Sequence, residues 1–146
     1  MNAPQQMKQP PSHPLPFRIA SLSKVSALIV DDDEFQLDLL NQVLRAAGVQ
    51  DVTTANSAKQ ALRLLEAGKA RFNLILLDLQ MPEMDGFAMM DNLAKTAFTG
   101  GLIIVSDQNE DVLRAGALVA KLRRFSLLGT VAKPVEISAL SLLLPH

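Results

Sequence analysis

Acidic side chains end two apolar runs of this 146-residue chain. The first run closes with Val30, Asp31 and Asp32, and the second, residues 73–78, closes with Asp78. Carboxylates that meet at short range are unfavourable unless a positive charge lies among them. An oxygen-rich acidic cluster suits a hard divalent cation, above all Mg²⁺, which keeps several waters and accepts phosphate oxygens. If the fold brings these two ends together, the residue types predict a magnesium site.

Two further apolar runs end in groups that suit an anion. Residues 101–106 end in Ser106, whose hydroxyl can donate a hydrogen bond, and Lys133 with Pro134 follows residues 126–132. The lysine supplies a point positive charge, and the proline restricts the loop that presents it. Acids, a hydroxyl and an amine at four such ends predict a site for a metal-bound anionic group.

These runs belong to a pattern in which short apolar segments alternate with amphipathic ones. Strands are predicted over residues 25–30, 51–55, 73–78, 101–106 and 126–132, and helices over 34–47, 58–67, 86–97, 110–124 and 135–144. Such alternation is typical of a parallel sheet with helices on both faces. The second strand is more polar than the first, third and fourth, so it suits an edge. We therefore expect an α/β fold of the flavodoxin-like (βα)5 type, a doubly wound parallel sheet with strand order 2-1-3-4-5.

In such sheets, ligands bind outside the carboxyl ends of the strands, where the strand order switches. The switch in the expected order lies between the first and third strands. Asp31, Asp32 and Asp78 should therefore converge on one crevice.

Helical spacing predicts which helix residues face the core. In the first helix these are Phe35, Leu39, Leu40, Val43, Leu44 and Ala47, and in the third they are Met90, Leu93, Ala94 and Ala97. The fourth helix has two apolar faces, one with Ala115, Leu118, Val119 and Leu122 and one with Leu113, Ala117 and Ala120. A helix with two apolar faces needs two partners, so we expect an interaction surface there.

Composition excludes several other functions. The chain has no cysteine, which leaves no thiolate nucleophile or thiolate metal site, and its net charge of −1 disfavours nucleic-acid binding by this chain. No apolar run approaches the roughly 18 residues of a membrane span. We expect no membrane association and a cytoplasmic location. Most of the eight prolines lie in residues 1–23, which we predict to be a Pro/Gln-rich disordered leader before a single domain, residues 24–146.

Four motifs at the ends of the predicted strands resemble the receiver domain of two-component response regulators. They are VDDD after the first strand, LDLQMPEMDG after the third, IIVSD after the fourth and VAKP after the fifth. Each motif alone is weak, but all four in this order at the ends of alternating strands are specific. The resemblance covers residues 25–144.

The resemblance implies a role for each site residue. Asp78 is the phosphoacceptor, which takes a phosphoryl group from the phosphohistidine of a sensor histidine kinase or a phosphotransfer protein. Asp32, Asp78 and the backbone carbonyl of Gln80 bind Mg²⁺ directly, and Asp31 binds it through a water. Lys133 pairs with the carboxylate and then with the phosphoryl oxygens, and Ser106 donates to the phosphoryl group. The implied product is a switch in partner binding or in an attached output domain, and the chain is not an enzyme.

Three features depart from the family pattern. Asp107 stands where the family usually has a small residue, and Thr130 stands where many members have an aromatic switch residue. The interval from Ser106 to Lys133 is 27 residues, several more than is common, and the extra length falls in the fourth helix and its flanks. The predicted surface on residues 110–124 would contact an output domain or a second copy of the chain.

Other functions remain as alternatives. A phosphorylation-independent pseudo-receiver, acting as an interaction or dimerisation module, is the main one because of Asp107 and Thr130. Haloacid-dehalogenase-type phosphatases also phosphorylate a strand-end aspartate, but they need a second aspartate two residues later, where this chain has Gln80. A nucleotide or flavin site would need a phosphate-binding loop after the first strand, where this chain has an acidic one.

Overall fold

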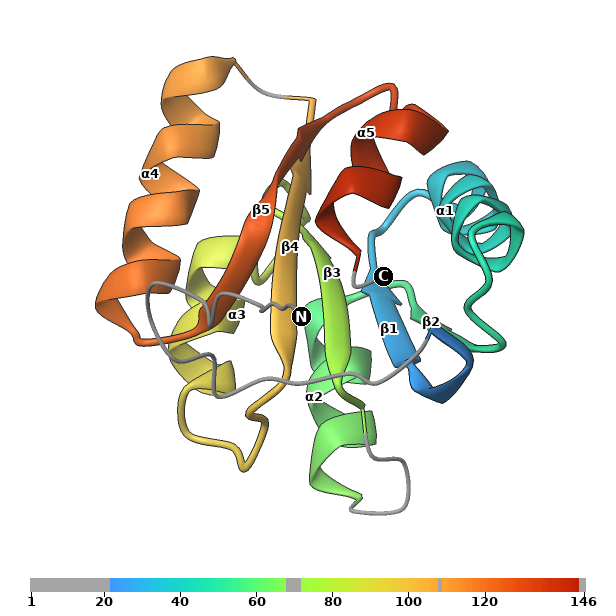
Figure 1. Ribbon diagram of the computed structural model, residues 1–146. Coiled ribbons are helices and arrows are strands. Elements are labelled where there is room, and N and C mark those ends of the chain that lie inside the picture. Colours follow the sequence, from blue (N-terminus) through green and yellow to red (C-terminus); the bar gives the residue numbers. More distant parts are fainter. Residues whose placement is uncertain (1–21, 68–71, 108, 145–146) are drawn as a thin grey trace, which may run out of the picture.

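The computed structural model describes residues 22–67, 72–107 and 109–144, and these residues build one five-stranded parallel sheet. Its strands are β1 (Ser26–Val30), β2 (Asp51–Ala55), β3 (Leu74–Asp78), β4 (Gly101–Ser106) and β5 (Ser126–Ala132). The order is β2-β1-β3-β4-β5, as predicted (Figure 1). All four pairings are parallel, so the carboxyl ends of the strands lie along one edge.

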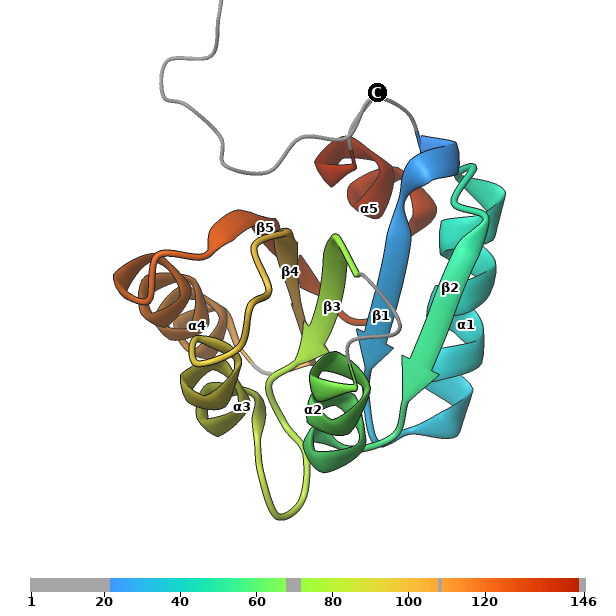
Figure 2. The same ribbon diagram turned by 90° about the horizontal axis from the view of Figure 1, so that it is seen from below.

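Helices cover both faces of the sheet (Figure 2). They are α1 (Glu34–Ala46), α2 (Ala58–Glu66), α3 (Gly86–Leu93), α4 (Glu110–Leu122) and α5 (Ile137–Leu143). α1 and α5 lie on one face, and α2, α3 and α4 lie on the other. A short 3-10 helix, Leu22–Lys24, precedes β1. Residues 1–21 of the predicted leader lie outside the described residues. None of the described helices is long and apolar enough to cross a membrane.

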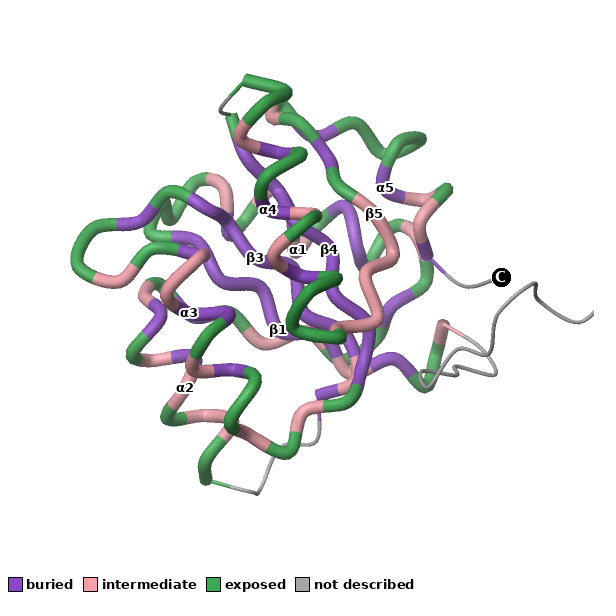
Figure 3. Tube along the Cα trace, turned by 90° about the vertical axis from the view of Figure 1, so that its left-hand side faces the viewer, coloured by how far each residue is buried: buried purple, intermediate pink, exposed green. Residues whose placement is uncertain are grey.

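The central strands divide their side chains between two hydrophobic cores. Along β3, Ile75 and Leu77 pack under α2, α3 and α4, whereas Leu74 and Leu76 pack under α1 and α5. This alternation follows from the two-residue period of a strand. β1, β3 and β4 are almost wholly buried, and β2 and β5 are more exposed, as expected for edges (Figure 3).

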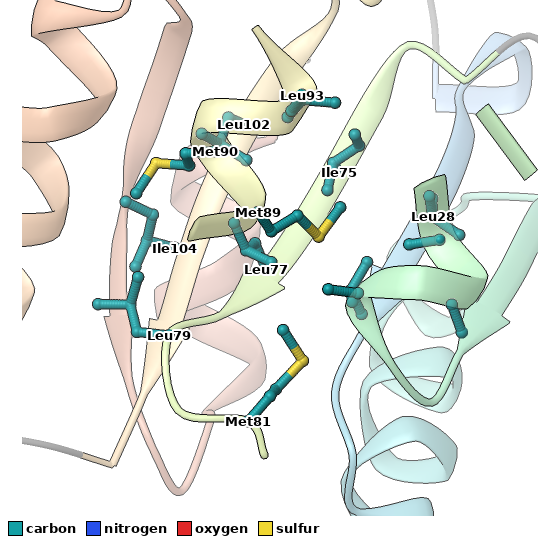
Figure 4. Close-up of a cluster of buried hydrophobic side chains, with 14 of the residues drawn as sticks. Leu28, Ile75, Leu77, Leu79, Met81, Met89, Met90, Leu93, Leu102 and Ile104 are labelled. Carbon is teal, nitrogen blue, oxygen red and sulfur yellow. The ribbon is translucent and has the colours of Figure 1, made fainter. Parts of the chain in front are cut away.

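The core under α2, α3 and α4 extends to the loop that follows β3. Met81 in this loop is buried, and its side chain extends towards the cluster that holds Met89 and Leu77 (Figure 4). Burial of this one thioether side chain fixes the loop against the core. The residues on either side of it are therefore held next to the end of β3.

Side-chain caps begin the helices close to the carboxyl ends of the strands. Asp33, Ser57, Asp85 and Asn109 each accept a hydrogen bond from a backbone N–H in the first turn of α1, α2, α3 and α4 respectively. Each such cap contributes about 1 kcal/mol to helix stability. The caps fix where each helix begins, next to the residues in the strand-to-helix loops.

Two predicted helix faces are wrong in part. Phe35 is 70% exposed, and the buried stripe of α1 is Leu37, Leu40, Val43 and Leu44. Phe35 lies two residues before Leu37, about 200° around the helix, so it points away from the sheet. Ala94 and Ala97 are also exposed, and α3 ends at Leu93 and not at residue 97.

The early end of α3 has a local cause in Thr96. Its hydroxyl donates to the carbonyl of Leu93 at 2.7 Å and accepts from the N–H of Phe98 at 3.2 Å. Threonine offers the backbone an alternative to the helical bonding pattern in this way.

The two apolar faces predicted for α4 are present, with one residue regrouped. Leu113, Gly116 and Ala120 are buried against the sheet, whereas Leu118 is 58% and Leu122 is 71% exposed. Val119, which was grouped with the exposed leucines, packs against the core.

Part of the extra length before Lys133 lies in β5 and not in α4. β5 uses seven residues along the six of β4, with a register shift that leaves Leu128 unpaired. This arrangement is a β-bulge, which absorbs one residue and twists an edge strand. Thr130 follows the bulge and is exposed.

Replacement of Gly86 by alanine should destabilise the protein more than replacement of Gly116. An added Cβ at Gly86 would lie 2.6 Å from the Asp78 carbonyl oxygen and 2.7 Å from Leu79 Cα, which are backbone atoms that cannot rotate away. At Gly116 the nearest atom, at 2.9 Å, is Cδ1 of the Leu79 side chain. We expect Gly86→Ala to cost about 2 kcal/mol. Gly116→Ala should be nearly neutral, since alanine gains about 1 kcal/mol in a helix interior. Urea denaturation measures both, and equal losses would contradict this explanation.

Candidate functional site

Three carboxylates meet at the carboxyl ends of β1 and β3, as the sequence predicts. Val30 is in register with Leu77, so the next residues of the two strands, Asp31 and Asp78, lie level with each other. Asp31 is 1% and Asp78 is 3% exposed, and Asp32 beside them is exposed to solvent. One oxygen from each of the three lies within 4.8 Å of the others.

The carboxylates open into a cleft of about 550 Å³ at this edge of the sheet. Its lining is Asp31, Asp32, Asp33, Asp78, Gln80, Met81, Pro82, Asp107 and Lys133. The lining comes from four strand ends, which is the expected location for a ligand in an open parallel sheet.

Lys133 brings the positive charge that the cluster needs. Its Nζ donates to Asp31 Oδ2 at 2.8 Å and lies 3.5 Å from Asp78 Oδ2. The backbone N–H of Lys133 donates to the Ser106 carbonyl at 2.9 Å, and the following Pro134 is joined by a cis peptide bond. The lysine therefore reaches from the end of β5, across β4, to the acids on β1 and β3.

Backbone hydrogen bonds fix the orientation of both buried carboxylates. Asp31 Oδ1 accepts from the Asp33 N–H at 2.9 Å, and Asp78 Oδ1 accepts from the Gln80 N–H at 3.2 Å. The loop after β3 is held in turn by the Gly86 N–H, which donates to the Leu79 carbonyl at 3.0 Å. The second oxygen of each carboxylate faces the Lys133 amine.

The acids and the lysine shift one another's ionisation. Burial, and after it the charge of Asp31, raises the pKa of Asp78 from 3.8 to about 6, although Lys133 and the Gln80 N–H act in the opposite direction. Burial acts to lower the pKa of Lys133, but its contacts with Asp31 and Asp78 outweigh burial and hold that pKa above its ordinary value. The single ammonium group thus compensates only part of the negative charge.

A hard divalent cation fits this donor set. The three clustered carboxylates supply oxygen ligands only, and the Lys133 amine lies within 3.5 Å of two of them. Asp32, which is exposed, leaves room for the water ligands that Mg²⁺ retains. Gln80 lines the cleft, and ligation by its carbonyl stays a prediction.

Ser106 lies at the carboxyl end of β4, beside the strand that ends in Asp78. It is fully buried at the end of β4, and it is not among the described residues that line the cleft. Donation from its hydroxyl to a group on Asp78 stays a prediction.

The sequence prediction missed three residues of the lining. Asp33 follows Asp32 directly, caps α1 and also lines the cleft. Met81 and Pro82 form an apolar rim. Their position in the short turn after Asp78 was the available signal.

The family model and the relatives found by comparison with known proteins belong to the same family. A family model for the response regulator receiver domain matches residues 27–144. Two-component response regulator ARR2 of Arabidopsis thaliana is 28% identical over 124 residues, which cover 85% of this chain and 18% of that protein. The chain therefore spans less than a fifth of the length of this relative.

Solved structures agree with the observed fold. A CheY-like receiver domain protein from Methanospirillum hungatei is 27% identical with a TM-score of 0.66, over 80% of this chain and 86% of the other. The receiver domain of the Arabidopsis histidine kinase CKI1, complexed with Mg²⁺, is 24% identical with a TM-score of 0.65, over 81% and 89% of the two chains. At this level of identity the second likeness shows the fold.

Asp78→Asn should stabilise the magnesium-free protein in a pH-dependent manner. Because the folded state keeps the Asp78 proton up to about pH 6 and the unfolded chain loses it near 3.8, the free energy of unfolding of the parent falls as pH rises between these values. Asparagine does not ionise, so the variant should gain on the order of 3 kcal/mol over this window and keep that gain above it.

Denaturant unfolding in EDTA from pH 4 to 8 measures the difference between the two proteins. Added Mg²⁺ should narrow the difference at pH 7.5, because a cation that binds the folded parent stabilises it. If the two free energies of unfolding differ by the same amount at every pH, the pH dependence does not come from ionisation of Asp78, and the prediction is wrong.

Proposed function

The chain belongs to the response regulator receiver domain family, and from this membership we propose that it accepts a phosphoryl group on Asp78. The donor is the phosphohistidine of a sensor histidine kinase or of a phosphotransfer protein. One observation carries the proposal: the Asp78 carboxylate lies at the end of a central strand, grouped with Asp31 and Asp32 and 3.5 Å from the Lys133 amine.

The reaction needs positioning and charge neutralisation more than covalent machinery. A carboxylate oxygen of Asp78 forms the new bond to phosphorus as the bond from phosphorus to the histidine nitrogen breaks, and the electron pair leaves with the imidazole. Because the pKa of Asp78 is about 6, the carboxylate is mostly ionised at neutral pH and can act as the nucleophile. Lys133, already 3.5 Å from Asp78, is close enough to pair with the incoming phosphoryl oxygens.

Asp32, Asp78 and the Gln80 carbonyl would hold Mg²⁺ directly and Asp31 would hold it through a water, and the bound cation would supply the further positive charge that a phosphoryl group requires. The residues of the chain position the reacting carboxylate. Hydrogen bonds from the Asp33 and Gln80 N–H groups keep Asp31 and Asp78 oriented towards the cleft.

Phosphorylation of Asp78 would change the charge at the carboxyl end of the sheet, next to the loops that follow β3 and β4. It replaces one carboxylate charge by about two and adds acceptor oxygens. We propose that Ser106 then turns towards the phosphoryl group and carries the loop after β4 with it. The chain is modified and switches partners, and it does not turn over a separate substrate. The cytoplasmic location stays a prediction.

Phosphorylation by a small donor tests the proposal. With Mg²⁺ and acetyl phosphate, the parent should gain one acid-labile phosphoryl group, measured by intact mass, and Asp78→Asn should gain none. EDTA should abolish labelling, and Lys133→Met should reduce it by about tenfold or more because the neutralising charge is lost.

Asp38→Asn is the matched control, since it makes the same chemical change at an exposed acid on α1. It should be labelled like the parent. If the parent remains unlabelled even with its cognate kinase, the pseudo-receiver alternative is favoured.

A second proposal concerns the exposed face of α4. Ala115, Leu118 and Leu122 are exposed there at spacings of three and four residues, the pattern of a helix that packs against another helix. The first turn of α4 carries two acids, Glu110 and Asp111, which share one ion-pair partner, Arg114, and the last turn carries Lys121.

We propose that a second copy of the chain packs antiparallel on this face. In that orientation the acidic start of one helix lies against the basic end of the other, and the leucines lie between them. A parallel pair would place like charges together, which is unfavourable.

Leu118→Glu and Leu122→Glu should abolish this self-association. Light scattering after size-exclusion chromatography should show a concentration-dependent dimer for the parent and a monomer for each variant, because a buried unpaired charge opposes assembly. Leu142→Glu is the control, since Leu142 is 80% exposed on α5. A parent that stays monomeric at every concentration would overturn the dimer and direct attention to an output domain as the partner.

A further inference from the structure

A small cavity lies at the amino ends of β4 and β5, at the edge of the sheet opposite the acidic cleft (Figure 1). Its volume is about 110 Å³. The loop before β4, the turn after α4 and the first residue of β5 supply its lining, which is Phe98, Thr99, Gly100, Arg124, Phe125 and Ser126. Both phenylalanines also pack against the core under α2, α3 and α4. The cavity thus combines apolar walls with a guanidinium group and two hydroxyls.

Arg124 occupies a backbone position that usually favours glycine. At the end of α4, the Phe125 N–H donates to the Ala120 carbonyl and the Arg124 N–H donates to the Lys121 carbonyl, both at 3.0 Å. This arrangement places the residue after the cap in the left-handed region, and Arg124 has a φ of 67°. The same pair of bonds ends α1, where the residue at the equivalent position is Gly48. A side chain at positive φ is unfavourable relative to glycine, so the backbone alone does not account for an arginine there.

Two polar groups of the lining lack partners within the described part of the chain. The exposed guanidinium of Arg124 makes no hydrogen bond or ion pair with the described residues, whereas the neighbouring Arg123 pairs with Asp91 at 2.6 Å. The Ser126 hydroxyl oxygen is buried and has no hydrogen-bond partner among the same residues. A buried hydroxyl without a partner is unfavourable, and a serine hydroxyl rotates to suit a new one. A ligand in the cavity can therefore bond to both groups.

We propose that this cavity binds a small carboxylate with a planar apolar body. The body contacts Phe98 and Phe125, and the carboxylate accepts two parallel hydrogen bonds from the Arg124 guanidinium and one from the Ser126 hydroxyl. A cavity of roughly 150 Å³ holds one benzene ring, so the smaller volume here limits the body to about one ring.

The position of the cavity couples such a ligand to α4 and not to the cleft. Arg124 and Phe125 form the turn that follows α4, and Phe98 belongs to the loop before β4. A ligand that contacts all three residues holds the end of α4 against this loop. The exposed leucines Leu118 and Leu122 lie in the same half of α4, so the ligand acts on that surface without phosphorylation of Asp78.

Titration with benzoate tests this site. In amide NMR spectra of the isotope-labelled full chain, benzoate should shift the signals of Thr99, Gly100 and Phe125 along one saturable curve, with a dissociation constant on the order of 1 mM. The signals of Asp31 and Asp78 should not move. Added KCl should weaken binding, because salt screens the attraction between the carboxylate and the guanidinium.

Three variants separate the charged contact from the rest of the cavity. Arg124→Gln should weaken benzoate binding about tenfold and binding of its neutral analogue benzamide by about twofold or less, because only benzoate carries the charge that the guanidinium recognises. Ser126→Ala should weaken both ligands about threefold through loss of one hydrogen bond. Lys121→Gln is the matched control, since it removes an exposed cation of α4 that is not in the described lining, and it should bind benzoate like the parent.

Arg124→Gly gives a readout that a loss of folding cannot imitate. Glycine relieves the positive φ, so without ligand this variant should unfold at a higher temperature than the parent. It should nevertheless lose about tenfold in affinity for benzoate. Benzoate should therefore raise the unfolding temperature of the parent more than that of the variant.

Three results would overturn the proposal. They are amide signals that shift without saturation, saturable shifts confined to the acidic cleft, and equal affinity for benzoate in the parent and in Arg124→Gln. None of them bears on phosphorylation of Asp78, which acid-labile labelling measures separately.

Discussion

Two buried carboxylates share one ammonium group at the carboxyl end of the sheet, and the site is arranged around this contact. Asp31 and Asp78 are level on neighbouring strands, so the sheet register itself forces the two acids together. Burial and mutual repulsion both oppose their ionisation, and Lys133 offsets only part of that opposition, which is why the pKa of Asp78 stays near 6. Such a cluster gains stability from any further positive charge, and this makes it suited to a cation and to the anion that the cation carries.

The scaffold holds this unfavourable arrangement by being apolar and closely packed elsewhere. β3 is buried along its whole length between two cores, so Asp78 cannot withdraw from the cluster without moving the centre of the sheet. Gly86 allows α3 to approach the backbone of Asp78 and Leu79 more closely than a side chain would permit. The Ser106 carbonyl fixes the backbone of Lys133 on the other side. Packing energy and backbone hydrogen bonds thus hold charges that would separate in solution.

The segment after β4 links the cleft to the exposed face of the molecule. Asp107 lines the cleft, Asn109 caps α4, and α4 then carries the exposed leucines Leu118 and Leu122. The loop that follows β4 therefore leads from the cleft directly into the helix that carries these exposed leucines. In a chain with Thr130 exposed on β5 and no aromatic side chain at that position, this loop is the shortest covalent connection between the two regions.

The sequence by itself determined the strand order and the residues of the acidic cluster. Alternating apolar and amphipathic segments allow few topologies, and parallel strands bring their carboxyl ends to one edge whatever the details of packing. Asp31, Asp32, Asp78 and Lys133 could therefore be placed together without coordinates. Local caps such as Asp33 and Asp85 were also predictable, because they act within one turn of the chain.

Where competing contacts have similar energies, only the tertiary structure decided the outcome. The hydroxyl of Thr96 ends α3 early, a bulge at Leu128 takes up a residue of β5, and Phe35 faces solvent although its spacing suits a core position. The burial of Ser106 and the partial compensation of Asp78 by Lys133 depend in the same way on distances between segments far apart in the sequence. Periodicity gives the direction of a side chain on its own element, but depth and electrostatic environment depend on every element packed around it.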